Sequence, residues 1–319
     1  MPAIEVQDLR KNYGSVEAVR GISFTVGEGE VFSLLGPNGA GKTTTVEILE
    51  GYRRRDGGTV SVLGHDPVRG ERSFKERIGI VLQQTGVEEF LTVREAVDMF
   101  RGYYPHPRPT GEIIELVELK PKQNSRITTL SGGQRRRLDV ALALAGDPDL
   151  VFLDEPTTGF DPAARRNAWQ VVKNLSDLGK TILLTTHYMD EAQFLADQVA
   201  VVVGGVIVAE GPPSTLAGRE TAATRIRFRA MDGAGPPPIA GVDASKVSDG
   251  VVELRTQNPT PVLHQLTSWA LERGHPLEAL EVGRPTLEDV YLELTGEAQA
   301  SHEDEAATQP ASRRRRARA

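Results

Sequence analysis

The chain has 319 residues, a formal net charge of −7, 39% hydrophobic residues and no cysteine. Its length suits one large domain with a smaller one, and the absence of cysteine excludes a disulfide scaffold, thiolate metal sites and cysteine catalysis. The negative charge argues against a general nucleic-acid-binding protein, whose affinity comes largely from neutralising phosphates.

Short apolar stretches alternate with helix-like stretches as far as about residue 211. We predict strands at 4–9, 22–26, 31–35, 59–63, 78–82, 150–153, 181–185 and 199–203, and helices at 42–50, 162–178 and 188–196. Between residues 83 and 130 the strand pattern stops, and 93–100 and 113–119 show helical spacing instead. This order is typical of an α/β fold with a mostly parallel sheet and a helical insertion.

A different pattern follows the Gly-Pro-Pro sequence at 211–213. We predict strands at 224–228, 251–254 and 277–282, helices at 261–272 and 287–294, and a glycine- and proline-rich loop at 232–238. From about residue 297 the apolar periodicity ends and the chain becomes rich in arginine. The predicted organisation is therefore a large domain over 1–215, a small α+β domain over 220–296 and a disordered tail over 297–319.

The sequence predicts neither secretion nor a membrane-spanning helix. Residues 1–9 lack the basic start and the long apolar core of a signal peptide. The longest apolar stretch, 198–203, is far shorter than the roughly 20 residues that cross a bilayer. If the protein moves a compound across a membrane, we expect the pore to belong to another polypeptide.

A glycine-rich loop of the form G-x-x-x-x-G-K-[ST] joins the predicted strand 31–35 to the helix 42–50. It consists of Gly36, Pro37, Asn38, Gly39, Ala40, Gly41, Lys42 and Thr43, and Thr44 follows. The glycines let the backbone approach phosphates, and the N–H groups at the helix start favour an anion. We predict that Lys42 reaches the β- and γ-phosphates of a nucleotide and that the Thr43 hydroxyl completes a Mg²⁺ shell. The flanking strand and helix disfavour the alternative, an ordinary glycine-rich turn.

Two carboxylates, Asp154 and Glu155, directly follow the wholly apolar strand 150–153. In α/β proteins ligands bind at this edge of the sheet. Consecutive strand residues face opposite ways, so we expect the two side chains to have different roles. For either residue alone, a solvated charge at a strand end is the simpler alternative.

Between the loop and the carboxylates lies the run Leu130, Ser131, Gly132, Gly133, Gln134. Ser131 can cap a helix that continues to residue 144, and such a helix start presents N–H groups and a hydroxyl to an anion. With the loop before it and the carboxylates after it, this run resembles the ATP-binding cassette (ABC) family. The resemblance implies a P-loop cassette with a RecA-like core, an antiparallel β subdomain and a helical subdomain over about 84–145.

The resemblance also implies a homodimer that holds two ATP molecules at its interface. Ser131, Gly132, Gly133 and Gln134 would contact the γ-phosphate held by the opposite subunit, and Asp161 would communicate between the two sites. The family's leucine before this aspartate is Phe160 here, which is a conservative apolar change.

Within each site, the resemblance assigns roles to several further residues. Asp154 would hold Mg²⁺, Glu155 would polarise the attacking water, and His187 would contact the γ-phosphate. Gln83 would sense Mg²⁺ and the water; Gln84 stands beside it, and the strand register favours Gln83. Tyr13 would stack on the adenine ring.

Two arginine-rich stretches carry no predicted binding role. Arg135, Arg136 and Arg137 are interpreted as the solvated face of a helix. The arginines of the tail 297–319 could attract anionic lipid, but the acidic residues at 303–305 favour an ordinary solvated tail.

The final segment, 285–296, resembles the C-terminal stretch of drug-efflux ATP-binding subunits of the daunorubicin-resistance type. We therefore predict an ATPase that powers export of a small hydrophobic compound. It would contact a separate permease around residues 83–91 and lie at the cytoplasmic face of the membrane. The alternatives are a soluble regulatory ATPase acting on a ribosome or another protein, and the motor of a lipid or polysaccharide exporter.

Overall fold

The computed structural model describes residues 2–81, 87–219, 221–229, 239, 242–248, 251–274, 277–292, 294 and 296. The chain forms two compact units, Met1–Pro213 with Leu294–Ala319, and Ser214–Glu293. Gln83, Gln84, the predicted loop 232–238 and the predicted tail 297–319 lie outside the described residues. Among the described residues, no helix has both the length and the apolar content that crossing a membrane requires.

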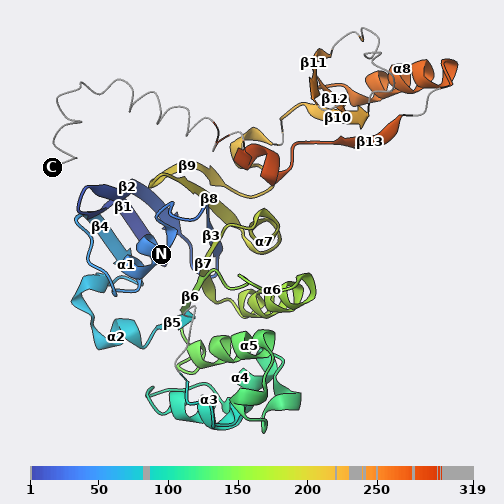
Figure 1. Ribbon diagram of the computed structural model, residues 1–319. Helices are drawn as coiled ribbons and strands as arrows, with labels where there is room; N and C mark the ends of the chain where they lie inside the picture. Colours follow the sequence, from blue (N-terminus) through green and yellow to red (C-terminus); the bar gives the residue numbers. More distant parts are fainter. Residues whose placement is uncertain are drawn as a thin grey trace. The chain divides into compact units, whose positions relative to one another are not determined.

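A six-stranded sheet in the order β5-β6-β7-β3-β8-β9 forms the centre of the larger unit (Figure 1). Its strands are β3 (Val31–Leu35), β5 (Ile78–Val81), β6 (Leu150–Asp154), β7 (Thr181–Thr186), β8 (Gln198–Val203) and β9 (Val206–Gly211). The first five strands of the sheet run parallel, as predicted, and β9 pairs antiparallel with β8. The parallel order places the carboxyl ends of β3, β6 and β7 at one edge, where the loops that follow them meet.

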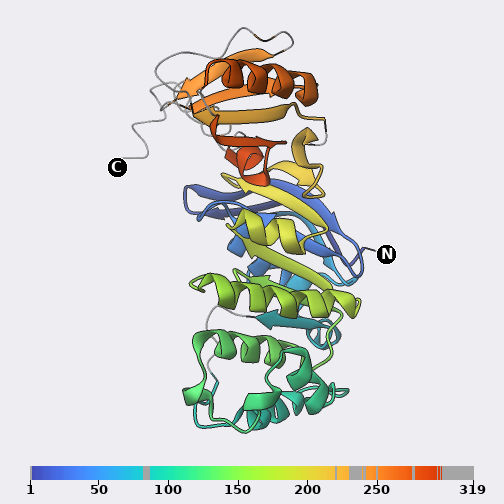
Figure 2. The same ribbon diagram turned by 90° about the vertical axis from the view of Figure 1, so that its right-hand side faces the viewer.

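Both faces of this sheet are covered, which explains why its strands are continuously apolar. In β6, Val151 and Leu153 belong to one core cluster, whereas Leu150 and Phe152 belong to another. The first cluster includes residues of α5 (Gly132–Ala143), α6 (Pro162–Asp177) and α7 (Met189–Leu195), which lie in front of the sheet in Figure 2. The second includes residues of α1 (Lys42–Leu49) and of a three-stranded antiparallel sheet, β2-β1-β4. That sheet consists of β1 (Ile4–Tyr13), β2 (Val16–Val26) and β4 (Gly57–Val62).

The predicted helical insertion is confirmed in the described residues 87–130, which contain helices and no strand. Its α-helices are α3 (Val93–Arg101) and α4 (Thr110–Leu116), and α5 follows. Thr92 and Glu95 form a capping box that fixes the start of α3. The remaining short helices of this unit are α2 (Arg72–Lys75), η1 (Pro67–Arg69), η2 (Lys120–Lys122) and η3 (Ile127–Thr129).

The smaller unit is an α+β structure built on a four-stranded antiparallel sheet in the order β11-β12-β10-β13. Its elements are η4 (Leu216–Gly218), β10 (Thr224–Arg229), β11 (Asp243–Ser248), β12 (Val251–Thr256), α8 (Pro259–Glu272) and β13 (Glu278–Gly283), and residues 287–292 are helical. Ile226, Phe228 and Leu254 pack with Val262 and Leu266 of α8. The alternate strand residues face the other side of the sheet.

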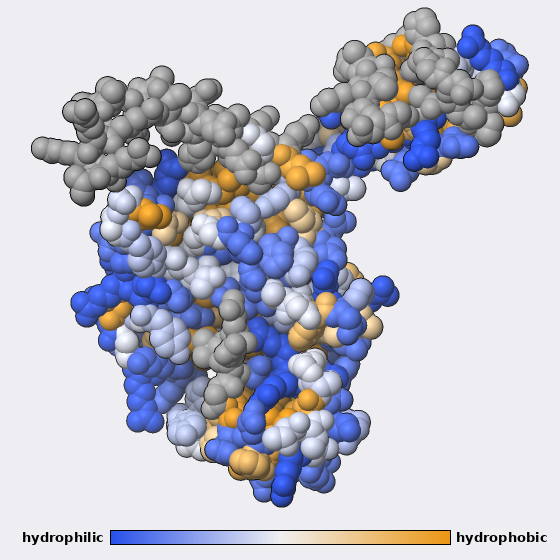
Figure 3. Space-filling view, viewed as in Figure 1, coloured by the Kyte–Doolittle hydropathy of each residue, from blue (hydrophilic) through white to orange (hydrophobic). Residues whose placement is uncertain are grey.

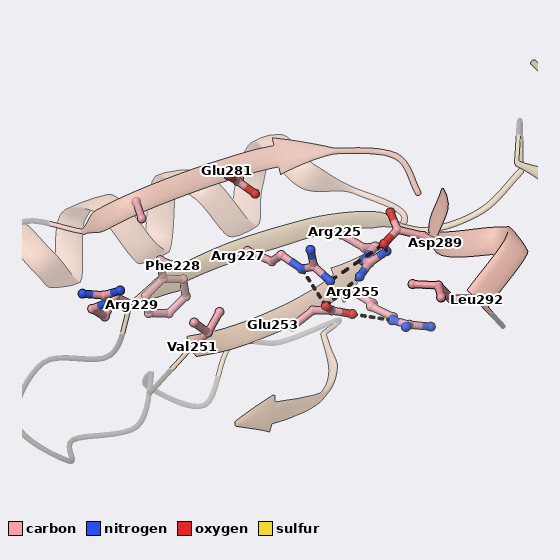
Figure 4. A pocket seen from close by; sticks show the side chains of 11 residues that line it. Arg225, Arg227, Phe228, Arg229, Val251, Glu253, Arg255, Glu281, Asp289 and Leu292 are labelled. Atoms are coloured by element: carbon pink, nitrogen blue, oxygen red, sulfur yellow. Dashed lines mark hydrogen bonds and ion pairs between the residues drawn. The ribbon is translucent and has the colours of Figure 1, made fainter. Parts of the chain in front are cut away.

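That other side is a charged hollow of about 750 Å³ (Figure 4). Glu253 lies at its centre and accepts hydrogen bonds from Arg225 (3.0 Å), Arg227 (2.9 Å) and Arg255 (3.0 Å). Arg225 also pairs with Asp289 at 2.6 Å. Burial alone would raise the pKa of Glu253, but the three arginines outweigh burial and lower it to about 2.

This network predicts a pH-dependent stability of the smaller unit. Because folding lowers the pKa of Glu253 from 4.5 to about 2, its contribution is fully present above pH 4.5 and is lost as the pH falls toward 2. We expect Glu253→Gln to lower the Tm of this unit at pH 7 and to have a progressively smaller effect below pH 4.5. Thermal unfolding of both proteins across this pH range tests the expectation; a constant difference in Tm would contradict it.

Candidate functional site

The glycine-rich loop lies between β3 and α1, and close packing requires glycine at two of its positions. Gly41 has φ 100°, and a Cβ there would lie 2.4 Å from the carbonyl oxygen of Ala18. A Cβ on Gly36 would lie 2.2 Å from the carbonyl oxygen of Val202. The backbone of this loop, which has no side chain at these two glycines, leads directly into the first turn of α1. The N–H groups of that turn lack helical partners.

Lys42, the first residue of α1, is buried inside the loop with 4% of its surface exposed. Its Nζ donates to the carbonyl oxygens of Gly36 (2.8 Å) and Pro37 (3.1 Å) and lies 3.8 Å from Glu155 Oε1. Burial lowers the pKa of Lys42, while the carboxylates of Glu155 and Asp154 act in the opposite direction. The loop thus surrounds an ammonium group that faces a carboxylate.

Asp154 ends β6 and lies opposite Thr185 of β7 in the parallel register. Its Oδ1 accepts a hydrogen bond from the Thr185 hydroxyl and lies 3.5 Å from the Thr43 hydroxyl of α1. A carboxylate and a hydroxyl beside a phosphate-binding loop fit Mg²⁺, which binds proteins through one or two carboxylates together with substrate phosphates. Thr43 and Asp154, the two residues predicted to bind Mg²⁺ here, therefore lie side by side.

Glu155 lies beyond the end of β6 in a left-handed conformation, with φ 44°. Its N–H donates to the carbonyl oxygen (3.2 Å) and hydroxyl (3.0 Å) of Thr185, and its Oε2 accepts from the Thr158 hydroxyl at 3.0 Å. His187 Nδ1 lies 3.4 Å from Glu155 Oε1, although it does not meet hydrogen-bond geometry. The two carboxylates have different hydrogen-bond partners, but the alternation of strand residues is the wrong reason, because only Asp154 belongs to the strand.

Tyr13 ends β1 beside the start of α1. Its hydroxyl lies 3.5 Å from the Thr44 hydroxyl, and its ring remains 40% exposed. The guanidinium of Arg53 lies 5.1 Å from the ring centroid. Lys11 Nζ also lies 5.7 Å from this centroid, so a partly exposed aromatic side chain flanked by two cations lies next to the phosphate loop.

The run Ser131–Gln134 forms a separate hollow of about 280 Å³, which Asp161 also lines. Ser131 and Gln134 form a capping box at the start of α5, with Gln134 N donating to Ser131 Oγ at 3.3 Å. Asp161 caps α6 by accepting from Ala163 N and Ala164 N, both at 2.9 Å. Two helix starts thus meet at this hollow, and none of its described lining residues belongs to the phosphate loop.

Sequence reasoning missed three side chains that fix this site: Thr185, Thr158 and Arg136. Thr185 could have been found from the strand register, because parallel neighbours place it beside Asp154. For Arg136 the predicted solvated face is wrong, since only 9% of its surface is exposed. The helical rotation turns Arg136 inward toward the end of β6, whereas Arg135 pairs with the exposed Glu89.

A further groove of about 360 Å³ lies between the sheet edge at β5 and the helices α3 and α5. Tyr52, Ile80 and Phe100 contribute apolar lining, and apolar surface (orange) is visible in the region of α3 to α5 in Figure 3. Glu50 also lines the groove, and burial, with Asp154 and Glu47 nearby, raises its pKa to about 8. The groove is therefore less charged near neutral pH than its composition indicates.

A phosphate loop between a parallel strand and a helix, with an acidic residue ending a neighbouring strand, defines a P-loop nucleotide-hydrolysing fold. Sequence comparison is more specific. Residues 19–158 match the family described as ABC transporter, and residues 224–286 match the C-terminal domain of ABC transporter domain-containing proteins. The Nod factor export ATP-binding protein I of Paraburkholderia xenovorans is 38% identical over 92% of this chain and 97% of that protein. The daunorubicin/doxorubicin resistance ATP-binding protein DrrA of Streptomyces peucetius is 37% identical over 92% of each chain.

The chain therefore belongs to the ATP-binding proteins of ABC transporters, and its reaction is ATP hydrolysis. Solved structures agree with this assignment. The ABC transporter subunit cbiO1 from Clostridium perfringens is 27% identical, with a TM-score of 0.60 over 67% of this chain and 89% of that chain. A dimeric ATP-binding cassette bound to ADP and Pi is 25% identical, with a TM-score of 0.58 over 66% of this chain and 98% of that chain. These matches confirm the predicted family, fold class and ATPase activity.

Proposed function

We propose that two copies of this chain hold two ATP molecules between them and that hydrolysis powers export through a separate permease. Each ATP would lie between the phosphate loop of one copy and Ser131–Gln134 of the other. The observation that supports this proposal is the presence of two glycine-containing helix starts with separate surroundings, at α1 and at α5, each of a kind that favours an anion. A single chain would use only the first for its own ATP, so the second requires a partner.

The proposed nucleotide contacts follow from where each residue lies in or beside the phosphate loop. Lys42 would bind the β- and γ-phosphates, with the N–H groups of residues 36–44 around them, and Tyr13 would cover the adenine. Thr43, Asp154 and, from outside the described residues, Gln83 would hold Mg²⁺, which supplies positive charge beside the phosphates when bound. Asp161 would contribute from the partner-facing hollow.

Hydrolysis further needs a group that accepts a proton from water. Glu155 is the proposed general base because its carboxylate lies beside both Lys42 and His187, at 3.8 and 3.4 Å. His187 would contact the γ-phosphate beside this carboxylate. The Glu155 N–H donates to the Thr185 hydroxyl, the Thr158 hydroxyl donates to Glu155 Oε2, and together these hydrogen bonds hold the base in one orientation.

The proposed permease contact is the apolar groove beside β5 together with residues 87–91. Phe90 is 72% exposed and Tyr52 68% exposed, so both present aromatic surface to solvent. Tyr52 lines the groove and Phe90 precedes α3, and exposed aromatic residues are typical of the anchors of a protein interface. Attachment there would bring the chain to the cytoplasmic face of the membrane.

Phe90→Ser tests this contact. If Phe90 is an anchor of the interface, its loss weakens permease binding by about 30-fold or more, as expected for a buried aromatic hot spot. Affinity would be measured with the co-expressed permease, and ATP binding should remain unchanged. Leu271→Ser is the matched control, because Leu271 is also exposed (82%) but lies on α8. Equal permease binding by all three proteins would contradict the proposed contact.

The cargo is proposed to be a small hydrophobic, drug-like compound. Two relatives carry names that refer to Nod factor export and to daunorubicin/doxorubicin resistance, which supports export but not one cargo. Stimulation of ATP hydrolysis by candidate compounds, measured in the complex with the permease, tests this proposal. A neighbouring reading frame without membrane-spanning helices would instead favour a regulatory ATPase.

A further inference from the structure

Arg136 is a buried arginine that bonds to the main chain of another element. It lies on α5, is 9% exposed, and donates from Nη2 to the carbonyl oxygen of Asp154 and from Nε to that of Pro156, both at 3.2 Å. These two carbonyl groups stand immediately before and after Glu155 in the chain. One guanidinium therefore bridges the backbone on both sides of the residue that carries the proposed base.

The backbone that Arg136 bridges has a conformation that needs support. Glu155 has φ 44°, in a region that residues other than glycine rarely occupy. The peptide group between Asp154 and Glu155 is held from both ends, because its carbonyl accepts from Arg136 and its N–H donates to Thr185. Relaxation of φ to a common value would move the Glu155 carboxylate away from Lys42 and His187.

The start of α5, near Arg136, lies at the hollow formed by Ser131–Gln134. The capping box of Ser131 and Gln134 fixes this helix start, and Arg136 follows within the next turn. A second hollow of about 420 Å³ runs between α5 and the chain after β6, with Gly132, Arg136, Glu155 and Thr158 in its wall. Residues 131–136 of α5 and its cap therefore connect the helix start with the main chain around the proposed base.

We infer that Arg136 is a positioning residue that holds the main chain of Glu155 in its left-handed conformation and ties the proposed base to the start of α5. This inference rests on the proposed function, in which Glu155 accepts the proton from water. The planar guanidinium is required because its Nε and Nη2 form a rigid fork that donates to two carbonyl groups at once. A lysine has a single donor nitrogen and would replace this bridge only in part.

Two substitutions test the inference. Arg136→Gln should lower kcat by about tenfold to 100-fold, because a displacement of the base by about 1 Å is enough for such a loss. KM should change by less than about threefold, since the two hydrogen bonds of Arg136 go to main-chain carbonyl oxygens of Asp154 and Pro156 and not to the phosphate loop, and Arg136→Lys should recover part of kcat. ATP affinity, measured without turnover, should equal that of the wild type. Arg135→Gln is the matched control. This substitution removes the same charge at the preceding position, where the arginine pairs with Glu89 instead.

A double-mutant cycle with Glu155→Gln distinguishes positioning from a general structural role. If Arg136 acts through Glu155, adding Arg136→Gln to Glu155→Gln lowers the residual rate by less than about twofold. Full additivity of the two losses, or a wild-type kcat in either Arg136 variant, would overturn the inference. If Arg136→Gln does not fold, Arg136→Lys in the same cycle decides the question. Failure of the proposed function would appear separately, as normal turnover by the Glu155→Gln single variant.

Discussion

Glu155→Gln is expected to slow ATP hydrolysis by at least about 100-fold while ATP binding is retained, because an amide cannot accept a proton from water. The substitution keeps the size of the side chain, and the amide oxygen can still accept from the Thr158 hydroxyl. Since ATP binding closes the proposed dimer and hydrolysis reopens it, the variant should also accumulate as a dimer in ATP. Steady-state phosphate release measures the rate of hydrolysis, and titration with ATP measures the retained binding.

Glu115→Gln provides a matched control for this prediction. Glu115 loses the same charge, but it lies on α4 in an exposed ion pair with Lys120. The control should hydrolyse ATP at the wild-type rate, because exposed ion pairs contribute little to stability. Unchanged turnover by Glu155→Gln would remove this residue from the mechanism.

Lys42→Ala is expected to abolish measurable hydrolysis and to weaken ATP binding. Lys42 is the buried cation of the phosphate loop, and its removal leaves the β- and γ-phosphates without this charge. It also leaves the Gly36 and Pro37 carbonyl oxygens without the hydrogen bonds that now hold them. ATP titration and phosphate release measure the outcome, and near-normal activity would contradict the assignment of the loop. Lys120→Ala, at an exposed position, is the control.

Much of the fold was predictable because both faces of the central sheet are buried. Continuous apolar strands such as β6 and β7 are then visible in the sequence, and the helices between them have ordinary start signals such as Asp161 with Pro162. Two strands were not predicted, β9 and β11. β9 is a half-buried edge strand, and the apolar run at 206–209 after the turn at Gly204–Gly205 was a signal for its hairpin with β8 that the prediction overlooked.

The candidate site was predictable in its motifs but not in its conformation. The positions of Lys42, Asp154, Glu155 and His187 follow from motif order, and the structure brings all four to one edge of the sheet. The left-handed conformation of Glu155 depends on contacts with Thr185 and Arg136, which belong to other elements, so no local sequence pattern predicts it. Likewise, the inward direction of Arg136 depends on where α5 lies against β6.

The central claim is that each ATP joins the phosphate loop of one copy to the start of α5 in the other. Gly132→Asp, placed in the Glu155→Gln background, tests it through the α5 start. A Cβ at Gly132 meets no atom within 4 Å, so the new side chain fits, while its charge would repel a γ-phosphate arriving from a partner.

Sedimentation velocity with and without ATP, on Glu155→Gln and on the double variant, gives the decisive measurement. We predict that ATP converts Glu155→Gln from monomer to dimer, and that the double variant remains monomeric while it binds ATP with unchanged affinity. An ATP-dependent dimer of the double variant, equal in stability to that of Glu155→Gln, would contradict the claim.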